Sequence, residues 1–450
     1  MEFVVSFVDA VNNVLWGWLL LFLLCGTGIY YTLRLRFIQI RKLPYAFKRL
    51  FSNISLHGES ADKTGMSSFQ ALTTAIAAQV GTGNIAGAAT AIAAGGPGAI
   101  FWMWLSAFFG MATNYSEAVL ALNYKEQNEK GETVGGPAYY IRAAFKGSFG
   151  KALATFFSIA IIIALGFFGN MVQSNSIGDA FANAFKVDPV YVGVVVAFVS
   201  AAIFIGGTKR IAFVMEKLVP CMAVLYVAGC LIVILANITE IPSAFKTIFV
   251  MAFSPESAGG GALGITVQKA MRFGVARGLF SNEAGMGSTP HAHALAKVKH
   301  PDDQGVMAMM GVFIDTFIVL TCTALVIVIT GVWDDGATGT ALAQQAFGTV
   351  FGSFGNIYIA ICLLFFAFST IIGWYFFGES NVKSLLGTAY VKWYALIVVG
   401  FIVLGSGLKV DLVWNISDMF NGLMVLPNLL ALLALSGVVV AVAKSKESEK

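Results

Sequence analysis

Charged residues are scarce in this chain. Only 12% of its 450 residues are Asp, Glu, Lys or Arg, whereas 58% are hydrophobic. A soluble globular domain carries roughly 25% charged residues, so this chain has too few to cover a surface that faces water. The scarcity also excludes a disordered protein, since such chains are charged and poor in apolar residues. The five cysteines lie within apolar stretches, where we expect small buried residues rather than the disulfides of a secreted scaffold.

Long charge-free runs identify the class of protein. Residues 64–116, 152–178, 218–239, 336–378 and 419–443 contain no charged residue. About 20 apolar residues span the hydrocarbon core of a bilayer as a helix, so we expect an all-α membrane protein with about eleven transmembrane helices. The expected spans are 12–36, 67–94, 97–122, 152–183, 189–207, 213–236, 263–287, 304–332, 354–380, 391–408 and 411–443.

Basic residues indicate the orientation. If the N-terminus lies outside and the spans alternate, 22 of the 28 Lys and Arg residues fall in cytoplasmic segments. The external loops keep only Lys186, Lys246 and Lys409. This bias is typical of the positive-inside rule. We therefore expect a multi-pass protein of the cell membrane with a cytoplasmic tail, 444–450. Segment 37–66, which mixes basic and apolar residues, is expected to contain an interfacial amphipathic helix.

The spans divide into two sets after an N-terminal unit, 1–65. Residues 66–250 hold five expected helices and residues 251–443 hold another five. Because five is odd, the second set enters from the opposite side, which predicts a five-plus-five inverted repeat. Glycines interrupt the first helix of each set, at 79–84 and at 273–278.

Such interruptions have a functional interpretation and a structural one. Glycine weakens a helix, and unwound backbone inside a membrane must face protein or a water-filled cavity. Broken helices in matching positions of two halves point to the binding site of a transporter. Alternatively, the spacing of Gly83 and Gly87 is that of small residues at a close helix contact.

Three motifs resemble those of a known family. They are GGPGAIFWMWLS at 95–106, GGPAYYI at 135–141 and GLFSNEAGMGS at 278–288. They are similar to signatures of the alanine or glycine:cation symporter family, and the resemblance runs through nearly the whole chain. It implies a leucine-transporter-type fold with one extra N-terminal helix, and sodium-coupled uptake of alanine and glycine by alternating access.

The first interruption is the candidate substrate site. By resemblance, the backbone amides of Thr82 and Gly83 hold the substrate carboxylate. The N-terminus of a half-helix suits this task, because its free N–H groups and dipole attract an anion. Gln79 and Asn84 would add neutral donors and acceptors. Asn170 lies in a charge-free run, where its amide could bond the substrate or a neighbouring helix.

Bulky side chains would limit the size of the substrate. We expect the walls of a pocket that admits little more than a methyl group to be formed by Phe167, Phe273 with the adjacent Gly274, and Trp374. Each aromatic could equally serve packing or lipid contact.

The coupling ion has its own candidate residues. By resemblance, Ser369 and Thr370 match the adjacent hydroxyls of a sodium site, with backbone carbonyls of Ala77, Val80 and Phe366 as partners. Oxygen ligands suit a hard cation. Alternatively, the two hydroxyls bond carbonyls of their own helix.

Other polar residues are open to several interpretations. Glu117 and Asp315 lie in expected spans, where an unpaired charge is expensive, so they would be proton carriers or members of ion pairs. Arg277 and Glu283 would form gate or structural ion pairs. His291 and His293 are expected in a solvated loop.

A secondary transporter fits these features best. A channel would need a continuous pore, and no ring of charges or repeated filter motif is visible. An enzyme would need converging catalytic groups. We expect no cofactor beyond sodium as coupling ion and no nucleic acid as partner, with membrane lipid around the chain. Proton coupling is the alternative to sodium, and the oligomeric state stays unassigned.

Overall fold

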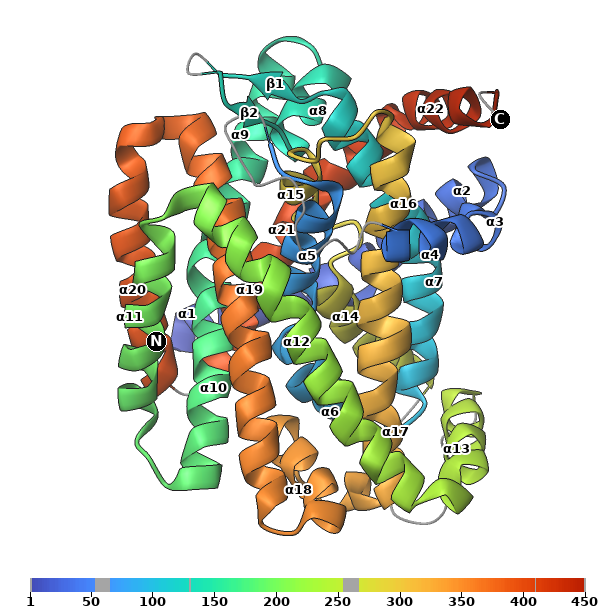
Figure 1. Ribbon diagram of the computed structural model, residues 1–450, viewed down its shortest axis with the longest axis vertical. Coiled ribbons are helices and arrows are strands. Elements are labelled where there is room, and N and C mark those ends of the chain that lie inside the picture. Colours follow the sequence, from blue (N-terminus) through green and yellow to red (C-terminus); the bar gives the residue numbers. More distant parts are fainter. Residues whose placement is uncertain (1, 53–64, 129–130, 254–266, 409, 449–450) are drawn as a thin grey trace.

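The computed structural model describes residues 2–52, 65–128, 131–253, 267–408 and 410–448. Nearly all of these residues are helical (Figure 1), as an all-α membrane protein requires. One small hairpin is an addition that the sequence did not predict. Its strands, β1 (Glu126–Gln127) and β2 (Thr133–Val134), pair antiparallel.

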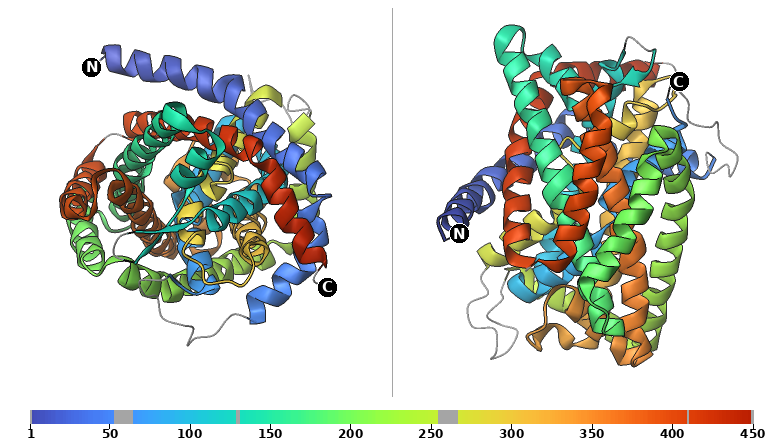
Figure 2. Two further views of the ribbon diagram at one scale, coloured as in Figure 1. Left: turned by 90° about the horizontal axis from the view of Figure 1, so that it is seen from above. Right: turned by 90° about the vertical axis from the view of Figure 1, so that its left-hand side faces the viewer.

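The N-terminal helix lies outside the main bundle. It runs obliquely along the bundle, and its first turns project from the body of the molecule (Figure 2). A short helix follows within the predicted amphipathic segment. The elements are α1 (Glu2–Val14), η1 (Leu15–Leu19), α2 (Leu20–Arg34), α3 (Ile38–Arg41) and α4 (Leu43–Ser52).

A first group of helices surrounds a broken central helix. α7 packs along both α14 and α16, and α6 packs against α14. Ser67 begins the central helix with a capping box, in which its side chain and that of Gln70 each accept from the other's backbone N–H. The elements are α5 (Ser68–Gln79), η2 (Gly83–Gly87), α6 (Ala88–Gly95), α7 (Ala99–Asn123), α14 (Val267–Asn282), α15 (Pro290–His293), α16 (Pro301–Val312), η6 (Phe313–Leu320) and α17 (Thr321–Thr330).

A second group packs beside the first. α10 packs against α19 and α20, whereas α12 crosses both α5 and α19 and so joins the groups. Cys230 and Cys362 are buried, whereas Cys25 and Cys322 are half-buried and Cys221 on α12 is exposed, so the expectation of five buried cysteines holds only in part. The elements are α9 (Gly147–Ile161), η3 (Ile162–Gly169), α10 (Asn170–Phe185), α11 (Pro189–Phe204), α12 (Gly207–Ala236), α19 (Phe354–Leu386), α20 (Val391–Gly407) and α21 (Val410–Ala434).

Short elements cover the two ends of the bundle. The hairpin lies at one end with α8 and α22, and we call this end the hairpin face; α13 and α18 lie at the opposite end (Figure 1). The remaining elements are α8 (Pro137–Ala144), η4 (Ile238–Glu240), α13 (Ile241–Phe253), η7 (Val332–Asp334), α18 (Gly339–Phe351), η8 (Thr388–Tyr390) and α22 (Ser436–Ser448).

Several helices can cross a membrane. Seven described segments are long and apolar enough, namely 3–34, 147–185, 207–236, 301–330, 354–386, 388–407 and 413–434. The other four predicted spans are helical over most of their described residues, but they are interrupted, shorter or more polar; residues 263–266 of the span 263–287 lie outside the described residues. The chain is therefore a multi-pass membrane protein, while the count of about eleven spans and the division into two five-helix units stay predictions.

The second interruption lies later than predicted. α14 is continuous through 273–278, and the chain leaves the helix only after Asn282. Glu283, Gly285 and Gly287 then have φ angles of 57°, 88° and 80°, which a right-handed helix cannot accommodate. The predicted break at Phe273 and Gly274 is therefore wrong.

The glycines inside α14 serve packing instead. A Cβ on Gly274 would lie 2.3 Å from the carbonyl oxygen of Ala99, and one on Gly278 would lie 3.2 Å from the Ser106 hydroxyl. Both glycines therefore let α14 approach α7 closely. Phe273 lies beside the end of α6, where a Cβ on Gly95 would be 3.3 Å from its own Cβ.

Gly274→Ala should destabilise the protein, because the added methyl group overlaps the α7 backbone. Overpacking typically costs about 1–3 kcal/mol, which thermal unfolding in detergent would detect. The matched control is Gly400→Ala in α20, where a Cβ meets nothing within 4 Å. The control should be neutral or stabilising, since alanine favours helix over glycine. If Gly274→Ala leaves the unfolding temperature unchanged but alters the affinity for alanine, Gly274 belongs to the substrate site and not to a packing contact.

Candidate functional site

The first break lies inside the first group of helices. α5 ends at Gln79, and the chain is helical again from Thr82, just before η2. Val80 and Gly81 between them are not helical, and all four residues are buried. The carbonyl predicted to bind sodium at Val80 therefore lies at the end of the first half-helix, where carbonyls lack helical partners.

Side chains satisfy the backbone amides of this break. Gly81 N–H donates to Asn84 Oδ1 at 3.0 Å, and Thr82 N–H donates to Gln173 Oε1 at 3.2 Å. Asn84 therefore acts as a cap of the break. The sequence analysis missed Gln173, although it lies one turn after Asn170 in the same charge-free run.

Three predicted substrate residues carry buried oxygen atoms without a hydrogen-bond partner in the described part of the chain. They are Gln79 Oε1, Thr82 Oγ1 and Asn170 Oδ1. The amide nitrogens of two of them are occupied, since Gln79 Nε2 donates to the Asn282 carbonyl at 2.7 Å and Asn170 Nδ2 to the Gly166 carbonyl at 3.0 Å. Buried polar atoms are almost always paired, so these three oxygens are unusual, although other buried side chains also carry such atoms.

The three predicted aromatic walls do not come together. Trp374 is buried beside Gly169 and donates its indole N–H to Glu283 at the second break. Phe167 instead stacks on Phe401 of α20, with 4.9 Å between the ring centroids. Phe273 lies at the contact of α14 with α6. Phe167 and Phe273 thus pack between helices, and the role of the three rings as walls of the substrate pocket stays a prediction.

Four of the five predicted sodium residues, all except Val80, come together in the described contacts. Thr370 Oγ1 lies 2.9 Å from the Ala77 carbonyl and 3.1 Å from the Phe366 carbonyl. Ser369 Oγ lies 3.3 Å and 2.8 Å from the same two oxygens. The hydroxyls thus contact their own helix, as the structural interpretation holds, and also the end of α5. A Cβ on Gly81 would lie 2.3 Å from Thr370 Oγ1, so the break passes directly over this cluster.

Glu117 of α7 holds the second break. Its carboxylate accepts from the backbone N–H groups of Gly285 and Gly287, at 3.0 and 2.9 Å, and from Asn428 Nδ2 at 2.7 Å. Tyr140 in turn donates to Asn428 Oδ1 at 2.5 Å. Glu117 therefore accepts hydrogen bonds from unwound backbone, and no ion pair to it occurs among the described residues.

The charges around the second break differ from the expected arrangement. Glu283 accepts from Trp374 and from Ser288 Oγ, not from a basic residue. Arg277 pairs instead with Asp418 of α21, with N–O distances of 3.1 and 2.9 Å. This pair links α14 to the second group of helices, which agrees with a gate or structural role for Arg277.

His291 and His293 are buried in α15, so the expectation of a solvated loop is wrong. His291 Nδ1 lies 2.7 Å from the Ser288 carbonyl, and its Nε2 lies 2.8 Å from Asn381 Nδ2. His293 Nδ1 lies 2.9 Å from Gln304 Nε2. The physical reason is that the chain re-forms a helix after the break and packs it between α5 and α7.

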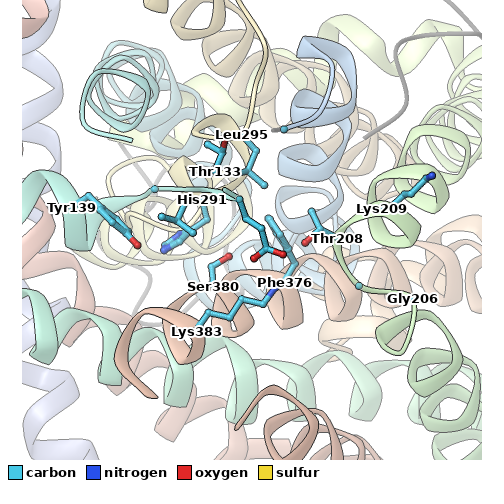
Figure 3. Close-up of a pocket in the computed structure, with 15 residues that line it drawn as sticks. Thr133, Tyr139, Gly206, Thr208, Lys209, His291, Leu295, Phe376, Ser380 and Lys383 are labelled. Carbon is cyan, nitrogen blue, oxygen red and sulfur yellow. The ribbon is translucent and has the colours of Figure 1, made fainter. Parts of the chain in front are cut away.

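A cavity of about 520 Å³ opens on the hairpin face (Figure 3). Thr133 of the hairpin, Thr208 of α12, His291 of α15 and Lys383 of α19 are among its lining residues. Since His291 also contacts the second break, the cavity leads from the surface toward that break.

The comparisons with known proteins agree with this geometry. The whole chain, residues 1–450, matches the profile described as the sodium:alanine symporter family. The chain belongs to the sodium:alanine symporter family. It is therefore a transporter and not an enzyme.

Two curated relatives and one solved structure add detail. The sodium/alanine symporter AgcS of Methanococcus maripaludis is 46% identical over 99% of this chain and 97% of its own. The probable sodium/glutamine symporter GlnT of Bacillus subtilis is 41% identical over 98% of this chain and 91% of its own. The structure of MhsT in complex with L-phenylalanine is 14% identical, with a TM-score of 0.58 over 86% of this chain and 98% of that one. This last likeness shows a leucine-transporter-type fold, as expected.

Gly81→Ala should lower the apparent affinity for sodium. The added methyl group would displace the Thr370 hydroxyl, and we expect the sodium concentration for half-maximal alanine uptake to rise at least tenfold, about 1.4 kcal/mol. Gly87→Ala in η2, on the other side of the break, is the control, because its Cβ meets only the Thr82 carbonyl oxygen, at 3.8 Å. If both folded variants need the same sodium concentration for half-maximal uptake, Thr370 does not bind the ion.

Proposed function

We propose that this symporter couples the uptake of alanine and glycine to sodium. One observation carries the proposal, namely the cluster of Ser369, Thr370 and the Ala77 carbonyl beneath the first break. Two hydroxyls and two carbonyls from α5 and α19 supply oxygen atoms only, as a hard cation prefers. Each hydroxyl has two lone pairs besides the hydrogen that it donates, so the same oxygens can turn toward an ion.

The amino acid would bind above this cluster. Its carboxylate is proposed to meet the backbone at Thr82 and Gly83, where the second half-helix begins and its N–H groups attract an anion. It would replace Gln173 Oε1 as the acceptor of the Thr82 N–H. The unpaired acceptors on Gln79, Thr82 and Asn170 are suited to an ammonium group, which offers donors only. No basic residue is needed for either group, in agreement with the charge-free run 64–116.

The distribution of basic residues supports one orientation of the protein in the membrane. The segments that carry Lys125, Arg142, Lys209 and Lys383 lie at the hairpin face, which the positive-inside rule favours as cytoplasmic. The cavity of Figure 3 would then be an exit path toward the cytoplasm. The N-terminus would lie outside and α22 inside.

Alanine uptake into proteoliposomes should require sodium and carry charge, because the amino acid is a zwitterion. A membrane potential contributes about 2.3 kcal/mol per charge and 100 mV, and a tenfold sodium gradient adds about 1.4 kcal/mol. Uptake driven by a sodium gradient would be compared with uptake when choline replaces sodium at constant pH. Undiminished uptake in choline that follows a proton gradient would establish the proton-coupled alternative.

Asn170→Ala should weaken alanine binding at least tenfold while sodium binding persists, because it removes an acceptor that we assign to the ammonium group. Isothermal titration with alanine at saturating sodium measures the effect. Asn237→Ala is the control, since Asn237 also donates to the carbonyl four residues earlier, but at the exposed end of α12. Equal alanine affinity of both variants would make Asn170 a packing residue.

A competition series of glycine, alanine, leucine and glutamine would show whether the preference is for small side chains.

A further inference from the structure

A small basic pocket lies where the two ends of the chain meet on the hairpin face. α22 lies there near α2 and α3 (Figure 1), and Arg41 Nη1 donates to Glu447 Oε1 at 2.9 Å, although these residues are 406 positions apart. Four basic side chains and one acidic side chain thus share one pocket. Its lining residues are Arg34, Leu35, Arg36, Arg41, Val440, Ala443, Lys444 and Glu447.

Arg41 forms the frame of this pocket. Besides its ion pair with Glu447, it donates from Nε to the Arg36 carbonyl at 2.8 Å and from Nη2 to the Leu35 carbonyl at 3.0 Å. Basic side chains commonly bond the last carbonyls of a helix in this way. Arg41 therefore closes the end of α2 and joins it to α22, and its donors are occupied.

The other three basic side chains carry charge that no acidic residue balances. Arg34, Arg36 and Lys444 are exposed, and no ion pair to any of them occurs in the part of the chain that the structure describes. The Arg34 guanidinium lies over the ring of Tyr30, at 5.5 Å from the ring centroid. Because Arg41 and Glu447 neutralise each other, three positive charges remain for a ligand.

The acidic member of the pocket also indicates a positive potential. The pKa of Glu447 lies below its usual value, because Arg41 donates a hydrogen bond to its carboxylate and because Arg41, Lys42 and Arg36 place positive charge around it. A second anion at this place would be stabilised by the same charges.

The pocket lies at the level where two membrane spans end. The span 3–34 ends at Arg34 and the span 413–434 ends at Ala434, and the pocket residues 34–41 and 440–447 follow directly. The polar headgroups of a bilayer begin where its hydrocarbon core ends. The positive-inside rule explains basic residues near the ends of spans, but it does not require that unpaired ones from two distant segments converge on one pocket.

Apolar side chains accompany the basic ones along the chain. Leu33, Phe37 and Ile40 are 61%, 44% and 57% exposed. Arginine can lay its aliphatic stem along such an apolar surface while its charged end stays among polar groups. A ligand that matches both features has an anionic group and a hydrocarbon part.

The size of the pocket limits the anionic group. Its volume is about 30 Å³, and one water needs roughly 10–15 Å³ of such space. The pocket therefore suits a group as small as a phosphate and is too small for a nucleotide or a peptide.

We propose that this pocket binds the phosphate group of an anionic phospholipid, with Arg34, Arg36 and Lys444 as the charged contacts. Basic pockets between membrane helices on the cytoplasmic side are a known means of holding such headgroups. The bound lipid would join α2 to α22. Because Lys446 of α22 also pairs with Asp303 at the start of α16, at 3.7 Å, the lipid would in turn steady the end of α16. The proposal does not depend on which ion is coupled to transport.

The test is the affinity of the purified protein for phosphatidylglycerol and for phosphatidylcholine with the same acyl chains, measured by native mass spectrometry. Both lipids contain a phosphate, but only phosphatidylglycerol has a net negative charge. We expect the wild type to bind phosphatidylglycerol at least tenfold more tightly. The triple variant Arg34→Gln/Arg36→Gln/Lys444→Gln should lose this preference. If it is not monodisperse, Lys444→Gln alone, in the exposed part of α22, should weaken phosphatidylglycerol at least threefold.

A matched control separates the pocket from a general basic surface. Lys146→Gln/Lys151→Gln/Lys392→Gln removes the same three charges at exposed positions outside the pocket and should keep the wild-type preference. Equal loss of the preference in this control would overturn the proposal. So would equal affinity of the wild type for the two lipids.

A competition with inorganic phosphate distinguishes a lipid from a free anion. We expect millimolar inorganic phosphate to leave phosphatidylglycerol bound, because it lacks the acyl chains that contact the apolar side chains. If inorganic phosphate displaces the lipid from the wild type, and raises the unfolding temperature of the wild type but not that of the triple variant, the pocket is a site for free phosphate and the lipid site is overturned.

Discussion

The structure depends on two stretches of unwound backbone in the interior of a membrane protein, whose polar groups must find partners without water. The first break obtains them from Asn84 and Gln173, the second from Glu117. These side chains belong to η2, α10 and α7, so each break determines which helices must lie beside it. The three inner π-helical segments, η2, η3 and η6, hold or adjoin the residues of the candidate site, as such segments frequently do at functional sites.

A consequence is that the interior has carboxylates but few cationic groups. Glu117, Glu283 and Asp315 are buried and accept hydrogen bonds from neutral donors. Arg277 of α14 forms an ion pair with Asp418 of α21 and not with one of these carboxylates. A zwitterionic substrate and a small cation can therefore enter without displacing a resident positive charge, whereas an anion would meet like charge.

The first break could be predicted from the sequence, because glycine and asparagine interrupt a run of alanine and isoleucine. The second could not, since glycines at packing contacts and glycines at positive φ look alike. Gly274 is a packing residue because α7 approaches it closely, whereas Gly285 lies in the break, where its N–H donates to Glu117. Neither contact is visible in the sequence. The contact of Thr370 with Ala77 joins segments that are 293 residues apart, which no local pattern reveals; the family resemblance supplied it. Gln173 and Asp315 had visible signals, but their roles depend on tertiary contacts.

The position of the Ser369–Thr370 cluster also suggests how an ion could act on conformation. It lies where α5 of the first group meets α19 of the second, so its oxygen atoms come from both groups. A ligand changes a conformational equilibrium only through its different affinity for the two states. An ion held between the groups would bind most tightly while their oxygens converge, so it would favour the arrangement of the groups in which α5 and α19 are in contact.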